Sequence, residues 1–282
     1  MSKNLETYKI STVDKEVIRA TKQSMENISW AMQGLNKIGM KMESGFKKIP
    51  EKQQQWLLAK TTNILSGVLR ANLTTMQKTK PFKKPMSKAY KSLVTGTGAI
   101  SGAFGAATGV GTAVFVSELA VSTKFIMRSI MDIARSEGED LEDIDTQLSC
   151  LEVFALGGVS EHDDALDNSY FATRVALRAT MSGASAFIAK NGFSGLGKVL
   201  MLSTNPLAQM IGLIASRFTM QVSEKFLAQA LPVVGAAGGA SINYMFIEHF
   251  QKMAKAHFTL RRLERKYGDE LVRTTYLEIE NI

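Results

Sequence analysis

The fold is decided by a stretch of 26 residues without a charge, SLVTGTGAISGAFGAATGVGTAVFVS, which runs from Ser92 to Ser117. Three further uncharged runs follow, at residues 179–189, 199–216 and 226–247. A helix needs about 20 apolar residues to cross the core of a bilayer, so the longer runs suffice in length. They are rich in Gly, Ala, Ser and Thr, however, and this composition makes their insertion into a membrane marginal.

Small residues recur at a spacing of four within these runs, as in the pairs Gly98 with Gly102, Gly105 with Gly109, and Gly235 with Gly239. This spacing lets two helix backbones approach closely and is typical of helix contacts in membranes. Tightly packed helices inside a soluble bundle use the same spacing. The sequence therefore predicts close helix contacts and leaves open whether a membrane surrounds them.

Helical periodicity extends through most of the chain. Apolar residues at spacings of three and four predict a long amphipathic helix over 14–49, with Met25 and Met32 in its stripe. Further helices are expected at roughly 52–76, 111–136, from Asp140 or Asp143 to Leu156, 165–189, 196–228 with a kink near Pro206, and 240–268. No stretch alternates apolar and polar residues as a strand would. The sequence predicts an all-α, multi-helix bundle whose glycine-rich helices are buried or contact a membrane.

The net charge of +8 is unevenly distributed. Residues 1–91 contain 18 Lys and Arg and 6 acids, whereas residues 92–282 contain 16 and 20. This division suggests an amphipathic N-terminal helical extension at 1–50 and a helical domain at 51–282. A basic linker at 76–91 carries the densest lysines, and Pro81 and Pro85 prevent a regular helix across it.

The lysines of the linker stand directly before the uncharged run and indicate a contact with anionic lipid. The candidate lipid-binding residues are Lys78, Lys80, Lys83, Lys84, Lys88 and Lys91. Arginines and stacking aromatics are too few here for a nucleic-acid module, so nucleic acid is disfavoured as a partner. A solvated linker, or pairing of the basic front with the acidic loops of the same chain, are the alternatives.

Motifs for chemistry are sparse. Gly96 and Gly98 begin a dinucleotide fingerprint, but Ser101 stands where its third glycine is needed. The acids at 139–143 and 161–164 are explained by helix capping, so no metal is expected. Cys150 lies among apolar residues, is expected in the core, and has no partner for an internal disulfide.

The remaining catalytic candidates lie on the polar face of the last long helix. They are Glu248, His249, His257 and Arg262. The two histidines are eight residues apart and cannot share one zinc ion as an i, i+4 pair does. We therefore expect no cofactor and lean away from an enzyme, with a lipid-directed hydrolase as the least favoured hypothesis.

Two stretches resemble the EcsC family. They are VSELAVSTKFIMRSIMDIARSEGEDLEDIDTQLSCLEVFALGG at 116–158 and LPVVGAAGGASINYMFIEHFQKMAKAHFTLRRLERKYG at 231–268. The resemblance covers most of 45–272 and implies a bacterial, helical, glycine-rich protein, in a family named after a protein encoded beside an ABC transporter. It assigns no catalytic residues. The positions that match the family's pattern are Glu118, Arg128, Gly138, Tyr170, Arg174, Pro232, Gly235, Gly239, Asn243, His249, His257, Arg262, Glu264 and Gly268.

The leading functional hypothesis is a helical protein at the cytoplasmic face of the plasma membrane, which binds anionic lipid or a membrane-associated protein. The first 30 residues lack the apolar segment of a signal peptide, and the lone cysteine fits a reducing cytoplasm. The alternative is a soluble interaction protein that forms homo-oligomers or binds a partner helix through residues 14–49.

Overall fold

A computed structural model of the chain describes residues 9–37, 49–76, 84–104, 109–156, 166–191, 205–230 and 235–279. These residues are helical and contain no strand, which confirms the all-α prediction. The α-helices are α1 (Thr12–Lys37), α3 (Glu51–Met76), α4 (Ser87–Phe104), α5 (Gly109–Ser136), α6 (Ile144–Glu152), α7 (Leu166–Asn191), α9 (Pro206–Ala230), α10 (Gly235–Tyr267) and α11 (Asp269–Glu278). A 3-10 turn, Val153–Ala155, follows α6.

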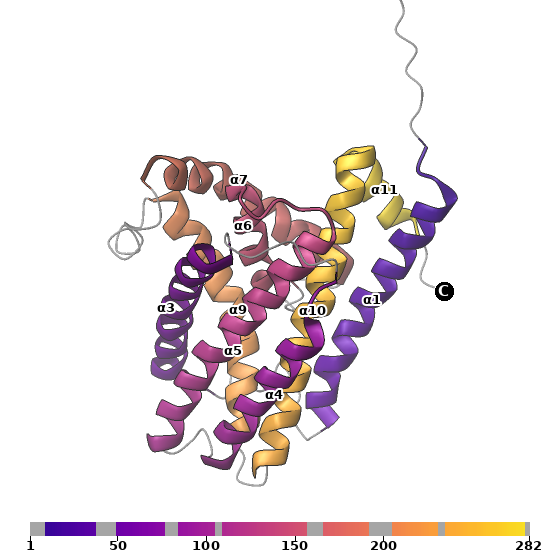
Figure 1. The fold of residues 1–282 in the computed structure, drawn as a ribbon. Helices are drawn as coiled ribbons and strands as arrows, with labels where there is room; N and C mark the ends of the chain where they lie inside the picture. Colours follow the sequence, from indigo (N-terminus) through magenta and orange to yellow (C-terminus); the bar gives the residue numbers. More distant parts are fainter. Residues whose placement is uncertain are drawn as a thin grey trace, which may run out of the picture.

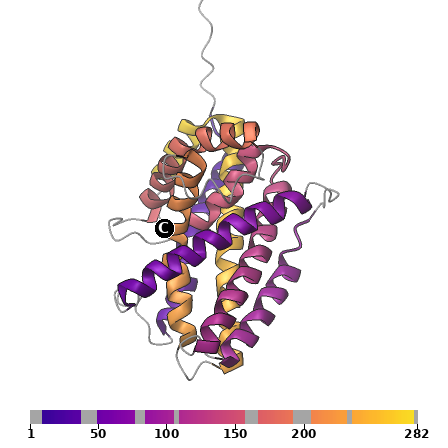
Figure 2. The same ribbon diagram turned by 90° about the vertical axis from the view of Figure 1, so that its left-hand side faces the viewer.

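The long helices form a bundle with two different ends. Helices α4, α5, α9 and α10 run along a common axis, α1 lies along one flank, and α3 crosses the other flank obliquely (Figure 1, Figure 2). Helices α6, α7 and α11 gather at the upper end in Figure 1. The lower end is formed by the C-terminus of α4 and the N-termini of α5 and α10.

Most predicted boundaries agree with the structure, and three features differ. The glycine-rich stretch after Pro85 is a regular helix, α4, so the last five residues of the predicted linker are helical. α9 begins at Pro206, where proline's fixed φ suits the first helical turn, and residues 192–204 lie outside the described chain. Gly268, with φ +89°, ends α10 as expected, but a further helix, α11, follows it.

The glycines hold α4 and α10 together in close antiparallel contact. A Cβ on Gly98 would lie 2.3 Å from the carbonyl oxygen of Gly239, and one on Gly102 would lie 2.3 Å from that of Gly235. Further up the pair, Asn243 donates to the carbonyl of Val94 at 2.7 Å. The glycine pairs predicted to mediate helix contact, 98/102 and 235/239, thus do so with each other; residues 105–108 lie outside the described chain.

The centre of the bundle is aromatic and closely packed. Phe154, Phe218 and Phe250 are fully buried, with ring centroids 4.9–5.6 Å apart. Cys150 is buried nearby, as expected from its apolar neighbours. Burial raises the pKa of its thiol, so the thiol stays protonated at neutral pH.

The described part of α1 packs on the body of the same chain. Ile18 and Met25 are buried in the common core. Lys22 donates to the carbonyl oxygen of Ile279 at 2.8 Å, and Asp14 accepts from Lys266 at 2.8 Å. The side chains beyond residue 25 in this helix lie outside the description, so the predicted oligomerisation through 14–49 stays a prediction.

Candidate functional site

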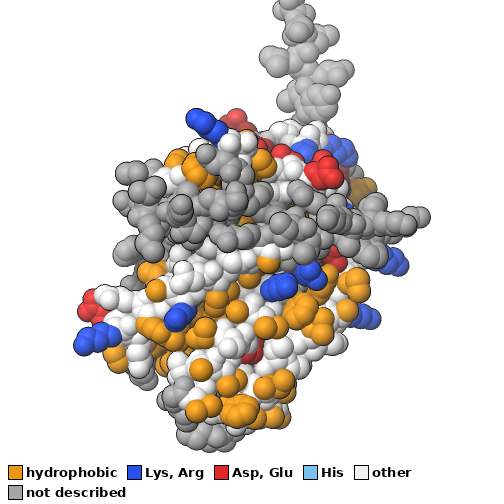
Figure 3. Space-filling view, turned by 60° about the vertical axis from the view of Figure 1, so that its left-hand side comes forward, with side chains coloured by type: hydrophobic (Ala, Val, Ile, Leu, Met, Phe, Trp, Pro, Cys, Tyr) orange, Lys and Arg blue, Asp and Glu red, His pale blue; other side chains and the backbone are white. Residues whose placement is uncertain are grey.

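The lower end of the bundle exposes apolar side chains and few charges. We call residues 92–104, 109–117 and 235–247 the uncharged end. Its exposed large side chains include Leu93, Ile100, Phe104 and Val110, with exposed fractions between 48% and 68%. Figure 3 shows mostly hydrophobic and uncharged side chains over this end, with Lys and Arg gathered above it. Several exposed large apolar side chains therefore lie at one end of the bundle, whereas apolar residues that are exposed singly are ordinary on a protein surface.

In its lower half, helix α4 has its large side chains outside and its small ones inside, whereas Val94 nearer its start is buried. The buried residues of its lower half are Gly98, Ser101 and Gly102, which face α10 and α9. On the opposite face, Leu93, Ile100 and Phe104 are exposed. A surface helix of a soluble bundle has the reverse arrangement, whereas small residues at the contact are typical of helices packed in lipid.

A buried ion pair lies inside this apolar half. The ammonium of Lys225 on α9 lies 2.8 Å from the carboxylate of Glu118 on α5, and both side chains are at most 4% exposed. Asn243 on α10 donates to the same carboxylate at 2.7 Å. Burial lowers the pKa of Lys225, although the facing carboxylate opposes that shift. The pair is neutral as a unit and adds no net charge to the uncharged end.

Glu224, next to Lys225, also carries little charge at neutral pH. Burial raises the pKa of its carboxyl to about 8, so the protonated form predominates at pH 7. One of its oxygens is buried without a hydrogen-bond partner among the described residues. The sequence reasoning did not select Glu118, Lys225 or Glu224 as a group, because they come from two helices that only the fold brings together.

Lysines surround the upper boundary of the uncharged end. We call Lys84, Lys88, Lys91, Lys124 and Lys252 the lysine rim. Lys84, Lys88 and Lys124 are exposed and make no ion pair with any described residue. The other predicted lipid-binding lysines, Lys78, Lys80 and Lys83, lie outside the described residues. From Ser92 to Phe104 the helix rises about 18 Å, close to the thickness of one leaflet's hydrocarbon.

One described helix, residues Val110–Ser136 in α5, is long and apolar enough to cross a membrane by length and composition. Less than half of its most apolar window is buried in the bundle. Phe115, Leu119 and Ile126 on this helix nevertheless belong to the common core. Its hydropathy therefore reflects core packing at least in part, as in the interior helices of soluble proteins.

Two of the four catalytic candidates, Glu248 and His249, differ in exposure and in their contacts. Glu248 accepts from Lys91 at 2.9 Å and is partly exposed. His249 is 1% exposed, lies edge-on to Phe250, and neither ring nitrogen has a hydrogen-bond partner among the described residues. Burial lowers the pKa of His249 to about 4, so its ring is neutral at pH 7.

His257 and Arg262 also have separate partners. His257 is fully buried and its Nδ1 lies 3.1 Å from the hydroxyl of Tyr170. Arg262 is half-exposed and donates to Glu137 at 2.9 Å. The structure therefore does not assemble Glu248, His249, His257 and Arg262 into one site.

The most polar part of the core lies at the upper end, between α6, α7 and α10. Glu152 faces His257 with 3.8 Å between Oε2 and Nε2, and its Oε1 has no partner among the described residues. Burial raises the pKa of Glu152 to about 7, and burial together with Arg174 lowers the pKa of His257 well below its usual range. Glu152 stands in an apolar run of the sequence, which gave no signal of this role.

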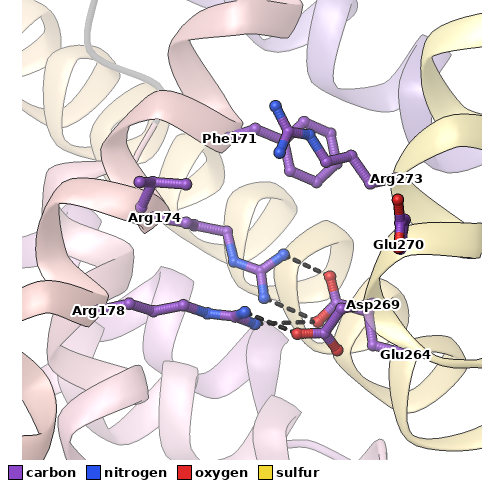
Figure 4. A pocket seen from close by; sticks show the side chains of 8 residues that line it. Phe171, Arg174, Arg178, Glu264, Asp269, Glu270 and Arg273 are labelled. Atoms are coloured by element: carbon purple, nitrogen blue, oxygen red, sulfur yellow. Dashed lines mark hydrogen bonds and ion pairs between the residues drawn. The ribbon is translucent and has the colours of Figure 1, made fainter.

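A cavity of about 280 Å³ opens beside this cluster, between α7 and α11 (Figure 4). Arg174 makes a bidentate pair with Glu264 at 2.6 and 2.7 Å, and Arg178 pairs with Asp269 at 2.6 Å. The full lining is Phe171, Arg174, Val175, Arg178, Glu264, Asp269, Glu270 and Arg273. Three arginines balance three carboxylates, so the cavity has no excess charge to attract an ion.

The acidic segment 137–143 serves two purposes. Asp143 caps α6 by accepting from the backbone N–H of Thr146, as the capping explanation predicts. Glu137 and Glu139 instead pair with α10, and Arg261 donates to Glu139 at 3.0 Å. Burial alone would raise the pKa of Glu139, but Arg261 and Arg265 lower it. Among the described residues no group of three or more His, Cys, Asp and Glu could hold a metal ion; the second acidic loop, 161–164, is not described.

The comparisons with known proteins give one match. The model of the EcsC protein family matches residues 13–263 of the 282. The match begins within α1, further toward the N-terminus than the resemblance read from the sequence. No curated protein and no solved structure matches the chain.

Proposed function

We propose that this chain, which belongs to the EcsC protein family, is a peripheral membrane protein that inserts its uncharged end into one leaflet and contacts anionic headgroups with its lysine rim. We expect it at the cytoplasmic face of the plasma membrane, where anionic lipids attract basic proteins. In this proposal the uncharged end is a wedge about one leaflet deep. The upper end, with its ion pairs, stays in water.

The observation that carries the proposal is the inverted arrangement of α4. Gly98 and Gly102 lie in the contact with α10, and Leu93, Ile100 and Phe104 remain on the outside. Apolar side chains that face outward gain free energy only where something apolar covers them. The adjoining exposed lysines favour a surface that is both apolar and anionic, and a lipid membrane combines the two.

The charges within the lower half also support the proposal. Glu118 and Lys225 neutralise each other, and the raised pKa of Glu224 favours its uncharged form. A free charge at this depth would oppose insertion by about 2–3 kcal/mol. These buried charges of the lower half are thus compatible with a low-dielectric surrounding.

Flotation with vesicles tests this proposal, and the chain offers a matched pair of variants. Val110 near the start of α5 is 68% exposed, and Val13 near the start of α1 is 73% exposed. Both occupy the second position of a helix, so Val110→Glu and Val13→Glu make the same change at opposite ends. The wild type should float with vesicles that contain phosphatidylglycerol, and added salt should weaken this binding.

Val110→Glu should lower vesicle affinity about tenfold or more, because it places a carboxylate in the inserted end. Val13→Glu should bind as the wild type does. If the two variants bind equally, or if the wild type does not bind anionic vesicles, the proposal is wrong.

A further inference from the structure

A second cavity lies on the lysine rim, at the level where lipid headgroups would be. It has a volume of about 460 Å³ and opens between α1, α4, α5 and α10. Lys91 of α4 and Lys252 and Lys255 of α10 line it together with Glu248. Unlike the cavity beside α7, this one has three cations for one carboxylate in its lining, and Lys255 also pairs with Glu137, which does not line it. Its excess charge is positive and points to an anionic ligand.

Hydrogen bonds within the protein hold the helices around this cavity in place without a ligand. Gln251 is 7% exposed, and its amide donates to the carbonyl of Ser87 and to the hydroxyl of Ser129, both at 2.9 Å. This double contact joins α10 to the start of α4 and to α5. Ser87 and Ser136 line the cavity and add hydroxyl groups to it. A site that exists before its ligand arrives loses less free energy on binding.

Glu248 places one carboxylate beside two of these lysines. Its carboxylate accepts from Lys91 at 2.9 Å and lies 3.9 Å from the ammonium of Lys252. Burial would raise the pKa of Glu248, but Lys91 lowers it, so the carboxylate is charged at neutral pH. The side chain therefore holds two lysines toward one point. A phosphate oxygen has the charge and size to share these two ammonium groups.

We propose that this cavity binds a phosphate monoester, held by Lys91, Lys252 and Lys255 beside Glu248. The inference rests on the proposed membrane function for one source of that group, the headgroup of an anionic lipid such as phosphatidic acid. A soluble phosphate ester is the other source. A monoester carries more charge and more acceptor oxygens than a diester, so the three lysines favour it.

The test compares two kinds of vesicle and one soluble probe with the full-length chain. Vesicles contain phosphatidic acid or phosphatidylglycerol in phosphatidylcholine, adjusted to equal surface potential. Glycerol 3-phosphate, measured by calorimetry, is the soluble probe. Lys252→Gln removes a lining lysine, and Lys124→Gln removes a rim lysine outside the cavity as the matched control.

The wild type should bind phosphatidic acid vesicles about tenfold more tightly than phosphatidylglycerol vesicles of equal potential. Lys252→Gln should abolish this preference, whereas Lys124→Gln should weaken binding to both vesicles and keep it. An absence of headgroup preference, or equal effects of the two lysine variants, would overturn the inference.

The soluble probe separates this inference from the proposed function. If no vesicle binds but glycerol 3-phosphate does, with loss in Lys252→Gln, the membrane proposal fails and the cavity serves a soluble phosphate ester. If vesicles bind without headgroup preference and the probe does not bind, the membrane proposal stands and the cavity is not a phosphate site.

Discussion

The helices of this bundle are joined by different kinds of contact at its two ends. At the upper end, helices are joined by ion pairs and hydrogen bonds, such as Arg174 with Glu264 between α7 and α10. At the lower end, α4 and α10 meet through glycines, and the backbones themselves are in contact. The upper end combines exposed pairs, such as Arg178 with Asp269, and buried ones, such as Arg174 with Glu264, while the lower end buries one described ion pair and exposes apolar side chains.

This difference is the basis of the proposed membrane contact. Charged contacts with water at their edge are compatible with an aqueous surface, where each contributes little to stability. Small residues at a helix contact, with large apolar ones outside, suit a surrounding that is itself apolar. The boundary between the two ends carries the lysine rim, as expected for a protein that lies at an interface.

The largest effect expected from a single substitution is at the buried pair of the lower end. Lys225→Met leaves the carboxylate of Glu118 without its cation inside the core, and should lower the free energy of unfolding by about 3–5 kcal/mol. The double variant Lys225→Met/Glu118→Gln should recover part of that loss. Urea denaturation measures both, and a loss below about 1 kcal/mol for the single variant would contradict the burial of this pair.

The glycine contact should be the next most sensitive feature. Gly239→Ala places a methyl group 2.2 Å from the carbonyl oxygen of Gly98, a backbone atom that cannot rotate away. We expect a loss of about 2–3 kcal/mol. The matched control is Gly96→Ala in α4, where nothing lies within 4 Å and alanine should stabilise the helix by about 0.5–1 kcal/mol. If both substitutions change the free energy of unfolding in the same direction, the close approach of α4 and α10 is wrong.

The pH dependence of stability should report the titration of the buried polar residues at the upper end. The pKa of Glu152 is raised to about 7 from an ordinary 4.5, so the folded state binds the extra proton between these values. Stability from this group is present below pH 4.5 and is lost as the pH rises through 7. Glu152→Gln should therefore flatten the fall in Tm over this window.

At pH 8 the Glu152→Gln variant should be more stable than the wild type by about 1 kcal/mol, or about 2–4 °C in Tm. Thermal denaturation followed by circular dichroism at several pH values measures this. A steeper decline in the variant than in the wild type would reverse the predicted sign. Glu224, whose pKa is raised to about 8, contributes a fall of the same sign and is unchanged in this comparison.

The smallest effect is expected at the exposed ion pairs of the upper end. Arg178 and Asp269 are 47% and 59% exposed, although their charged atoms lie 2.6 Å apart. Arg178→Gln should change the free energy of unfolding by less than about 1 kcal/mol. A loss as large as that of Lys225→Met would remove the proposed contrast between the two ends.

The helices and the glycine contact could be predicted from sequence, because both depend on local spacing. Pairs four residues apart, such as Gly98 with Gly102, mark one face of a helix wherever that helix packs. The helix over 87–104 was not predicted. Its many glycines interrupt the apolar spacing of three and four residues that marks an amphipathic helix. The predicted end of α10 at Gly268 was correct. A glycine marks where one helix ends, but it does not predict whether another helix follows.

The candidate site was harder to predict, because its members come from different helices. Lys225 and Glu118 are far apart in sequence and were not connected by any motif. Glu248, His249, His257 and Arg262 lie on one helix, yet α10 places their side chains in separate surroundings. The lysines beside the uncharged run were recognised as a group, and the described ones do lie at the boundary of that end.

The depth of the uncharged end in a bilayer is the most direct test of the central claim. The one native cysteine, Cys150, is fully buried with a raised pKa, so a cysteine introduced at the surface can be labelled selectively. Phe104→Cys at the uncharged end and Val175→Cys on α7 replace side chains of similar exposure, 54% and 59%. Each variant carries an environment-sensitive fluorophore and is mixed with anionic vesicles that contain nitroxide-labelled lipids. Our account predicts strong quenching by nitroxides in the acyl region at position 104 and none at position 175, and equal quenching at both positions, or none at 104, would contradict it.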